Sequence, residues 1–541
     1  MLEEPIRYGE MMEIKWLKVL YPRCAEQVGE GWDALIAGLG EEAVPEVFSE
    51  FLETSTVSRP AYLPDLARLE LAVHELQAMP APAVLEEGGA LQINPSLTLL
   101  PLQWRHLCSV LWNRERQLVP ELGQEFVLLY KIPAQGQVRV RPASEKDLLA
   151  LKVLAEHLDR QKVADEAGVP VGTVDAAIEE ACHKGLLLSP PSAIQRTAAH
   201  YPAEGPHGWQ RHLRSEYFTL QWHVTQACDL HCKHCYDRSA ISPLTLEQGK
   251  LILDQFREFV LEQRVHGQVT FTGGNPLLYA HFTELYREAA QRNFTIAILG
   301  NPTTRKVLES LQQIQPLSFY QVSLEGLAEH NDSIRGAGHF QRIMEFLEIL
   351  QELSIYSMVM LTLTRENMGQ VLELAEILRG KVDLFTFNRL SQTGEGAGLA
   401  AADTENYRGF LEEFLQAAKS NPTISLKDNL INILKAEQGL APFGGCTGFG
   451  CGAAFNFCSL LPDGDLHACR KFQSPIGNVL DSSLLELYRS AAAERYRLGP
   501  EECRGCKIRP VCGGCQAVIQ SSGLDISKQK DPYCFLGGGD Q

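Results

Sequence analysis

The chain has 541 residues, of which 45% are hydrophobic and 21% are charged, and 67 acidic residues against 49 basic ones give a net charge of −18. This composition is typical of a globular protein and excludes disordered and fibrous classes, while the length suits roughly three to four domains. No apolar stretch reaches the ~20 residues of a membrane-spanning helix, the N-terminus lacks a secretory signal, and the acidic balance disfavours nucleic acid as a partner. We therefore expect a soluble, cytoplasmic protein with no membrane partner.

Residues 1–115 are expected to form a helical N-terminal domain, to which no motif assigns a firm role. Apolar residues recur at helical spacing over residues 63–77, and Pro64 suits the first turn of a helix. The segment PAYLPDLARLE (60–70) resembles the N-terminal domain of partner proteins of iron oxidases that modify peptides. A plain helical bundle is the alternative interpretation.

Residues 120–192 are expected to form a small module in which strands precede helices. The segments EFVLLYKI (125–132) and QVRVRP (137–142) flank a turn at Gln135 and Gly136 and so predict a hairpin. Three helices should follow, the first of them capped by Ser144 and Asp147. The module resembles the PqqD-like element, a winged helix that recognises leader peptides, and the resemblance implies that an exposed edge strand takes a peptide as an extra strand.

A winged helix that binds DNA, or one that only packs against the chain, is the alternative for this module. Its recognition segment (171–185) carries Asp175, Glu179 and Glu180 against a single lysine, which disfavours contact with phosphate. The polar residues 191–215, which include Pro and Gly, are predicted to form a linker.

The region 216–400 alternates strands with helices, a pattern that predicts a parallel sheet with helices outside it. Its six strand candidates fit an α/β fold of the partial (β/α)6 barrel type, whose chemistry is expected at the C-terminal strand ends. Thr245 and Gln248 predict a capping box for the helix at 244–260. The strand candidates are LQWHVT (220–225), QVTFTGG (268–274), FTIAILG (294–300), FYQVSLEG (319–326), YSMVMLTL (356–363) and KVDLFTFN (381–388).

Directly after the first of these strands, Cys228, Cys232 and Cys235 form a C-x3-C-x2-C motif. Without a secretory signal, thiols are expected to stay reduced and to bind metal rather than form disulfides. Three thiolates on one loop can hold three corners of a [4Fe–4S] cluster and leave one iron open, and a zinc site completed by His231 or His234 is the alternative. The loop resembles the signature of the radical S-adenosylmethionine (SAM) superfamily. The resemblance implies that SAM chelates the open iron and is cleaved to a 5′-deoxyadenosyl radical.

The same resemblance implies a SAM site at the strand ends. Gly273-Gly274-Asn275-Pro276 resembles the family's Gly-Gly-Glu-Pro segment, but Asn275 replaces the acid and leaves only a carbonyl acceptor for a substrate amino group. Glu325 occupies the position of a candidate base in sulfatase-maturing relatives. For Ser323, the alternative is a hydrogen-bonding cap at the end of its strand. For Arg335 and Arg389, the alternative is a location on the protein surface. The residues assigned to SAM binding are Tyr236, Gly273, Gly274, Asn275, Pro276, Ser323, Arg335 and Arg389.

Residues 401–541 carry nine of the fifteen cysteines. Their spacing resembles the SPASM extension of peptide-modifying radical enzymes, apart from the pair Cys512 and Cys515, which is one residue closer than in the family pattern. Cys458 is left over, and a zinc ribbon is the alternative for the two C-x2-C pairs. The resemblance implies two auxiliary [4Fe–4S] clusters, one held by Cys446, Cys451, Cys469 and Cys515 and the other by Cys503, Cys506, Cys512 and Cys534.

Taken together, these motifs predict a radical SAM enzyme that modifies a ribosomally made precursor peptide bearing a leader segment. An external electron donor such as ferredoxin or flavodoxin would reduce the cluster. The domain order and the Gly-Gly-Asn-Pro variant resemble maturases of the thiooxazole or selenooxazole type, which act on peptides containing cysteine or selenocysteine. The alternatives are oxidation of a protein cysteine or serine, thioether cross-linking, and, outside enzymes, a cluster-sensing regulator that binds DNA.

Overall fold

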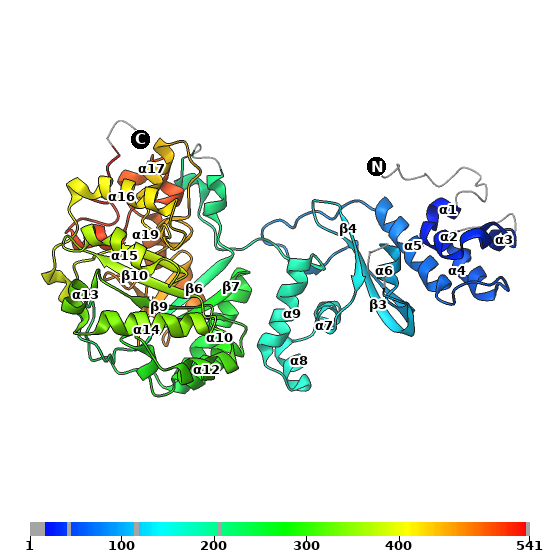
Figure 1. Cartoon of the computed structure of the whole chain (residues 1–541), viewed down its shortest axis with the longest axis horizontal. Helices are drawn as coiled ribbons and strands as arrows, with labels where there is room; N and C mark the ends of the chain where they lie inside the picture. The colour runs from blue at the N-terminus through cyan, green and yellow to red at the C-terminus, as the bar shows by residue number, and fades with distance from the viewer. Residues whose placement is uncertain (1–16, 40–44, 113–117, 203–204, 206–207, 537–541) are drawn as a thin grey trace. The chain divides into compact units, whose positions relative to one another are not determined.

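The computed structural model describes residues 17–39, 45–112, 118–202, 205 and 208–536, so the outer ends of the predicted terminal domains lie outside the described residues. The chain divides into two compact units, Met1–Pro191 and Ser192–Gln541, which Figure 1 draws and which are described separately here. Among the described helices, none is long and apolar enough to cross a membrane.

The first unit begins with a helical bundle that surrounds a small apolar core. The predicted helix over residues 63–77 is confirmed as α5, which directs Leu63 and Leu66 into this core. Two acids of the PAYLPDLARLE segment bind backbone: Asp65 accepts the N–H of Trp104 at 3.0 Å, and Glu70 accepts that of Cys24 at 2.9 Å. The bundle helices are α1 (Leu17–Leu20), α2 (Pro22–Val28), α3 (Trp32–Ile36), α4 (Pro45–Thr54) and α5 (Leu63–Ala78).

A three-stranded antiparallel sheet follows the bundle. The predicted hairpin is confirmed as β3 (Glu121–Lys131) and β4 (Val138–Pro142). A third strand that the sequence did not predict, β2 (Thr98–Arg105), pairs with β3, and the short helix α6 (Leu107–Leu111) lies between them in sequence. The predicted division near residues 115–120 therefore passes between two paired strands.

Three helices complete the first unit as predicted: α7 (Glu145–Ala155), α8 (Arg160–Ala167) and α9 (Val171–Lys184). The short strands β1 (Gln92–Ile93) and β5 (Leu187–Leu188) pair beside them. Ser144 and Asp147 form the predicted capping box of α7. Asp147 also accepts two hydrogen bonds from Arg141, at 2.8 and 3.0 Å, and one from Lys184 at 3.0 Å, so one buried carboxylate joins β4, α7 and α9.

The second unit contains the predicted barrel sheet, whose strands β6 to β11 pair in parallel in sequence order. All six predicted strands are thus confirmed, as is the Thr245–Gln248 capping box of α10. Figure 1 shows helices outside these strands. The strands are β6 (Tyr217–Thr225), β7 (His266–Gly273), β8 (Thr295–Leu299), β9 (Phe319–Ser323), β10 (Ser357–Leu363) and β11 (Leu384–Arg389). The helices are α10 (Leu246–Gln263), α11 (Phe282–Ala290), α12 (Arg305–Ile314), α13 (Ala328–Arg335), α14 (His339–Glu352), α15 (Val371–Leu378) and α16 (Thr404–Ala418).

The C-terminal segment extends the same sheet. Strand β12 (Phe457–Leu460) pairs with β6 in parallel, and the antiparallel strands β13 (Asp465–His467) and β14 (Pro475–Asn478) follow. One apolar core runs through the barrel and this extension. The remaining helices are α17 (Ile431–Glu437), α18 (Leu484–Arg489), α19 (Ala491–Leu498) and α20 (Gln516–Ser521).

The prediction of a linker over residues 191–215 is wrong for the residues after 191, which belong to the second unit. Ile194 is completely buried in its core, and the Ala193 N–H donates to the Gln263 carbonyl at 2.9 Å. Arg196 donates to the Cys451 carbonyl at 2.7 Å. Although the segment is polar in composition, Ile194 and Arg196 are buried and attach it to the second unit.

We expect Asp147→Asn to destabilise the first unit by about 1–3 kcal/mol, because Arg141 and Lys184 lose their shared counter-charge. Burial alone raises the pKa of Asp147, but hydrogen bonds from Arg141, Ser144 and Lys184 bring it below its usual value. A carboxyl with a depressed pKa stabilises the fold above its unfolded pKa of about 4, and this stabilisation is lost as the pH falls. Hydrogen exchange of the full chain, followed over β4, α7 and α9 from pH 6 to 3, should show a pH dependence that the variant lacks. The exposed Asp165→Asn is the matched control and should behave as wild type.

Candidate active site

A cavity of about 880 Å³ opens inside the barrel sheet of the second unit. Alternate residues of the strands line it, as expected for one face of a sheet: Thr219 and Gln221 come from β6, and Gln321 and Ser323 come from β9. The loops that follow the strands line the rest of the cavity. This arrangement places loop residues at the C-terminal ends of parallel strands, where barrel folds carry their chemistry.

The predicted cysteine triplet lies on the loop after β6, and all three cysteines line this cavity. The loop is held by its backbone: the Cys235 N–H donates to the Cys232 carbonyl at 3.2 Å, and the Cys235 carbonyl accepts the Glu395 N–H at 2.9 Å. Side chains also approach the sulfur atoms, since Asn301 Nδ2 lies 3.6 Å from Cys228 Sγ. Three cysteines of one loop therefore border one space.

The donor set suits a cubane cluster. A cubane binds each thiolate through a different iron atom, so its ligands need not converge. Burial raises the pKa of Cys232 and of Cys235, and iron would offset this by stabilising the thiolates.

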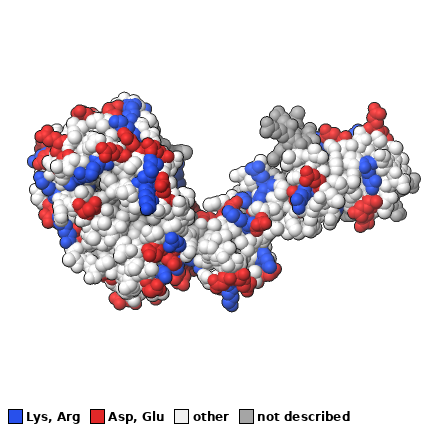
Figure 2. All heavy atoms as spheres, turned by 60° about the horizontal axis from the view of Figure 1, so that its bottom comes forward, with Lys and Arg blue, Asp and Glu red and all other residues white. Residues whose placement is uncertain are grey.

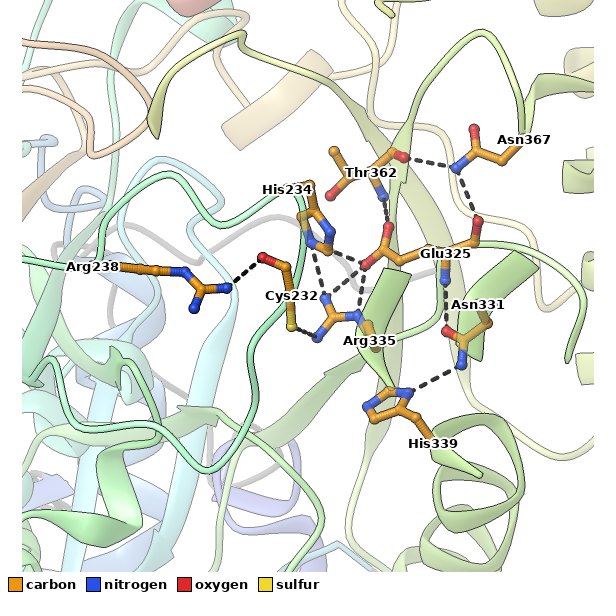
Figure 3. A network of polar contacts seen from close by, with 9 residues as sticks. All are labelled: Cys232, His234, Arg238, Glu325, Asn331, Arg335, His339, Thr362 and Asn367. Atoms are coloured by element: carbon orange, nitrogen blue, oxygen red, sulfur yellow. Dashed lines mark hydrogen bonds and ion pairs between the residues drawn. The ribbon is translucent and has the colours of Figure 1, made fainter. Parts of the chain in front are cut away.

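A buried ion pair adjoins the triplet (Figure 3). Glu325 Oε1 accepts hydrogen bonds from Nη2 and Nε of Arg335 at 2.6 and 2.9 Å, and Glu325 Oε2 accepts the Thr362 N–H at 2.8 Å. Arg335 Nη1 lies 3.7 Å from Cys232 Sγ and Nη2 lies 3.3 Å from His234 Nε2. Glu325 therefore fixes an arginine whose other nitrogen donates toward a predicted cluster ligand.

Two asparagine side chains, those of Asn331 and Asn367, hold the backbone beside this ion pair. Asn367 donates to the carbonyls of Glu325 and Thr362, each at 2.9 Å, and Asn331 accepts the Glu325 N–H at 3.1 Å. Figure 3 shows Asn331 in turn contacting His339. The ends of β9 and β10 are thus locked around the carboxylate.

The surroundings of Glu325 do not support its predicted role as a catalytic base. Its side chain is buried and absent from the cavity wall. Burial alone raises its pKa, but the neighbouring His234 and Arg335 and the hydrogen bond from Thr362 outweigh this and lower it. A buried, ion-paired carboxylate with a lowered pKa is a poor proton acceptor, so we treat Glu325 as a residue that positions Arg335.

The glycines of the Gly-Gly-Asn-Pro segment line the cavity, but Asn275 and Pro276 do not. The N–H groups of Gly274 and Asn275 donate to the carbonyls of Thr225 and Ala227 at 2.8 and 2.7 Å. Asn275 is buried, and its amide donates to Asp229 at 3.0 Å while its carbonyl caps the turn that begins at Pro276. The prediction that Asn275 and Pro276 contact the cofactor or a substrate amino group is therefore not supported.

Three further residues predicted to bind SAM differ in their surroundings. Ser323 and Tyr236 line the cavity, and Arg470 lies over the Tyr236 ring with its guanidinium carbon 5.3 Å from the ring centroid. Arg389 also reaches the wall, but its guanidinium pairs with Asp428 at 2.7 Å and with Asp531 at 2.8 and 2.7 Å. Because protein carboxylates occupy its donors, the predicted contact of Arg389 with the cofactor carboxylate is not supported.

The C-terminal cysteines separate into two sets of four. Burial raises the pKa of Cys451 to about 12, and the neighbouring Cys515, Cys446 and Cys469 contribute to this. In the other set, burial raises the pKa of Cys503 and of Cys512, and Cys506 and Cys534 contribute to both rises. Cys446, Cys451, Cys469 and Cys515 line the cavity, whereas Cys503, Cys506, Cys512 and Cys534 do not. The family resemblance implied the same grouping, and the assignment of these cysteines as cluster ligands stays a prediction.

Cys458, which the sequence left over, is a core residue. It lies in β12 opposite Leu220 of β6, is completely buried, and has a pKa raised by burial to about 12. All fifteen cysteines fall within the described residues, and all are free thiols.

Sequence reasoning missed Asn301 and Asn429, the amides that hold the cysteine loops. Asn429 accepts the Cys446 N–H at 2.7 Å and donates to the Gly514 carbonyl at 2.6 Å. Isolated asparagines carry no spacing signal, and only their position directly after a strand or before a helix could have drawn attention to them.

Comparison with known proteins agrees with this geometry. Residues 222–378 match the Radical SAM superfamily, and residues 451–516 match SPASM, an iron-sulfur cluster-binding domain. The chain carries the radical SAM domain of an enzyme superfamily. Its cofactors are [4Fe–4S] clusters and SAM, and a SPASM domain follows its radical SAM fold.

Similar proteins carry several functions. An AdoMet-dependent heme synthase of Methanosarcina barkeri is 25% identical over 346 residues, which cover 59% of this chain and 97% of that protein. Mycofactocin maturase MftC of Mycolicibacterium smegmatis is 28% identical over 340 residues, covering 59% and 83%. The structure of Streptococcus suis SuiB bound to precursor peptide SuiA is 16% identical with a TM-score of 0.49, covering 76% and 96%.

We expect Arg335→Lys to make the cluster at the triplet harder to reduce, because a donor near the Cys232 sulfur is lost while the positive charge remains. The midpoint potential should fall, and SAM cleavage should slow by about 10–100-fold. Electron paramagnetic resonance during a redox titration measures the potential directly.

Arg342→Lys is the matched control for this variant. Arg342 is exposed, and its Nη1 donates to the Ala337 carbonyl at 3.2 Å. The control should keep the wild-type potential, and an equal change in both variants would contradict a specific effect at the sulfur.

Proposed function

We propose that this enzyme modifies a ribosomally made precursor peptide inside the cavity that joins the two groups of cysteines. The observation that carries the proposal is that one cavity of about 880 Å³ is lined both by the triplet and by Cys446, Cys451, Cys469 and Cys515. A substrate in this space lies between a SAM-binding cluster and an auxiliary cluster. When bound and reduced, the first cluster would supply the electron that cleaves SAM, and the chemistry would be removal of a hydrogen atom from a substrate carbon.

In this proposal the chain's own residues bind and orient the reactants. Cys228, Cys232 and Cys235 hold the SAM-binding cluster, and Ser323 and Tyr236 contact SAM from the cavity wall, beside the glycine turn. The cavity-facing tail cysteines hold one auxiliary cluster and the remaining four hold a second. The electron donor is an external protein of the ferredoxin or flavodoxin type.

The first unit supports a peptide as substrate. Within the described part of its sheet, β2 and β4 are the outer strands. The Ala143 N–H bonds to the Phe126 carbonyl and the Ile132 N–H to the Gln137 carbonyl, so by strict alternation Val138 and Val140 direct their backbone groups away from β3. The same alternation directs position 101 of β2 outward, where Pro101 offers no N–H. The open edge for a leader segment is therefore β4.

The surface of this unit disfavours DNA. On α9, Asp175 pairs with Arg160 at 3.0 Å, and Glu180 pairs with Lys184 at 2.7 Å and Lys146 at 3.5 Å. On the face drawn in Figure 2, basic and acidic side chains of this unit are interspersed. Contact with a phosphate backbone needs a surface of one sign, so we propose a PqqD-like module that captures a leader peptide and raises the local concentration of the core segment.

The resemblance to thiooxazole- and selenooxazole-type maturases extends this proposal to peptides that contain cysteine or selenocysteine. It rests on the domain order and on the Gly-Gly-Asn-Pro segment. In this proposal the modified bond lies at a cysteine or selenocysteine of the core segment.

The triple variant Cys228→Ala, Cys232→Ala, Cys235→Ala should lose all cleavage of SAM to 5′-deoxyadenosine, because the cluster that delivers the electron is missing. Iron should fall from about 12 to about 8 atoms per chain, as expected when one cubane of three is lost. Chromatography of anaerobic, dithionite-reduced reactions measures the product. Cys458→Ala is the matched control and should keep both iron and activity. Absence of cleavage in iron-loaded, reduced wild type would contradict the proposed chemistry.

Val138→Pro should weaken leader binding by about tenfold, since it removes an outward-facing N–H of β4 worth about 1–1.5 kcal/mol and leaves the β3 ladder intact. The assay is fluorescence anisotropy of the full chain with a labelled peptide encoded by a neighbouring short reading frame. Val138→Ala keeps the N–H and should bind within about threefold of wild type. Equal binding by both variants would argue against capture at this edge.

A further inference from the structure

The pair Cys512 and Cys515 departs from the family spacing, and the structure shows how the shorter connection is made. Gly513 and Gly514 between them have φ angles of 66° and 65°, a region that side chains rarely adopt. A Cβ on Gly514 would lie 2.7 Å from Asp531 Cβ. The two glycines reverse the chain, so that Cys515 lines the cavity while Cys512 belongs to the other set of cysteines.

Asp531 holds the backbone of Cys515 in this reversed connection. Asp531 Oδ2 accepts the Cys515 N–H at 2.8 Å, and Oδ1 accepts the Tyr533 N–H at 3.0 Å. The Asp531 carbonyl accepts the Cys534 N–H at 2.9 Å. One residue therefore binds the backbone of a cysteine from each set.

Arg389 fixes the orientation of Asp531. Its guanidinium binds both carboxylate oxygens of Asp531, at 2.8 and 2.7 Å, while its Nε binds Asp428. The side chains of Arg389 and Asp531 are only 4% and 1% exposed, and the Tyr533 ring centroid lies 5.0 Å from the Arg389 guanidinium carbon. A bidentate pair buried in this way has a single geometry, so the end of β11 dictates where Asp531 points.

We propose that Asp531, oriented by Arg389, is the positioning residue that aims the Cys515 thiol into the cavity as a ligand of the auxiliary cluster there. This inference rests on the proposed function, which supplies the cluster. Asp531 itself contacts neither cluster nor substrate and acts through the backbone of Cys515. The arginine that the sequence placed at the cofactor carboxylate thus serves the auxiliary site.

The test uses the full chain that already carries the three triplet alanines, so that only auxiliary clusters contribute to the spectrum. In this background we expect Asp531→Asn to shift the electron paramagnetic resonance signal and midpoint potential of the cavity-facing cluster. The second auxiliary cluster should keep its signal. A purely structural role would lower both signals together without moving either potential.

A double-variant cycle identifies the ligand through which Asp531 acts. Cys515→Ala removes the thiol, so Asp531→Asn combined with Cys515→Ala should change the signal no further than Cys515→Ala alone, because both changes act on one ligand. Additive shifts would overturn the proposal.

Asp428→Asn is the matched control, because Asp428 is the other carboxylate on Arg389 and has no hydrogen bond to Cys515 among those described. It should keep the wild-type signal, and a shift equal to that of Asp531→Asn would assign the effect to the charge of Arg389 and overturn the proposal.

If Asp531→Asn does not fold, Arg389→Lys replaces it. Loss of the bidentate contact should still move the signal of the cavity-facing cluster alone. An unchanged signal in Arg389→Lys would overturn the proposal. Failure of both auxiliary clusters to load into the triple-alanine chain contradicts the proposed function as well, whereas loading without any shift overturns this inference alone.

Discussion

Backbone pairing between the glycine turn after β7 and the loop after β6 is the constraint on which the cysteine triplet depends. Gly274 and Asn275 donate to the carbonyls of Thr225 and Ala227. A Cβ on Gly273 or Gly274 would lie 2.1 or 2.2 Å from those same carbonyl oxygens, a distance that no side chain permits. Because two adjacent strand ends are joined this closely, Cys228 leaves the sheet from a fixed point.

The same sheet also fixes the other end of the cavity. Strand β12 pairs with β6 in parallel, with Leu460 opposite Trp222. The C-terminal segment therefore contributes the strand beside β6, and the loop after β6 carries the triplet. The cavity-facing tail cysteines are therefore related to the triplet by neighbouring strands and a shared core. A barrel and a tail joined only by a flexible connection could not keep these two groups of cysteines on one cavity.

The sequence predicted those elements whose signals are local. Capping boxes at Ser144 and Thr245 and six apolar runs each lie within a few residues, and all are confirmed. Strand β2 was not predicted because it contains Pro101 and is defined by its pairing with β3. Residues 192–215 were wrongly predicted to be a linker because their composition is polar, although Ile194 is fully buried.

The site shows the same division between local and distant signals. Cysteine spacing is local, and the family resemblance that it carries implied how the tail cysteines group. The acids that pair with Arg335 and Arg389 lie 10, 39 and 142 residues away from them. A buried guanidinium requires a counter-charge, so an arginine at a strand end is as well explained by a distant carboxylate as by a ligand. At Arg389 that pairing has a chemical consequence. Burial raises the pKa of the Cys515 thiol and Asp531 adds to this rise, whereas Arg389 and Lys471 oppose it. Arg389 therefore offsets part of the unfavourable effect that the Asp531 carboxylate has on a thiolate at Cys515.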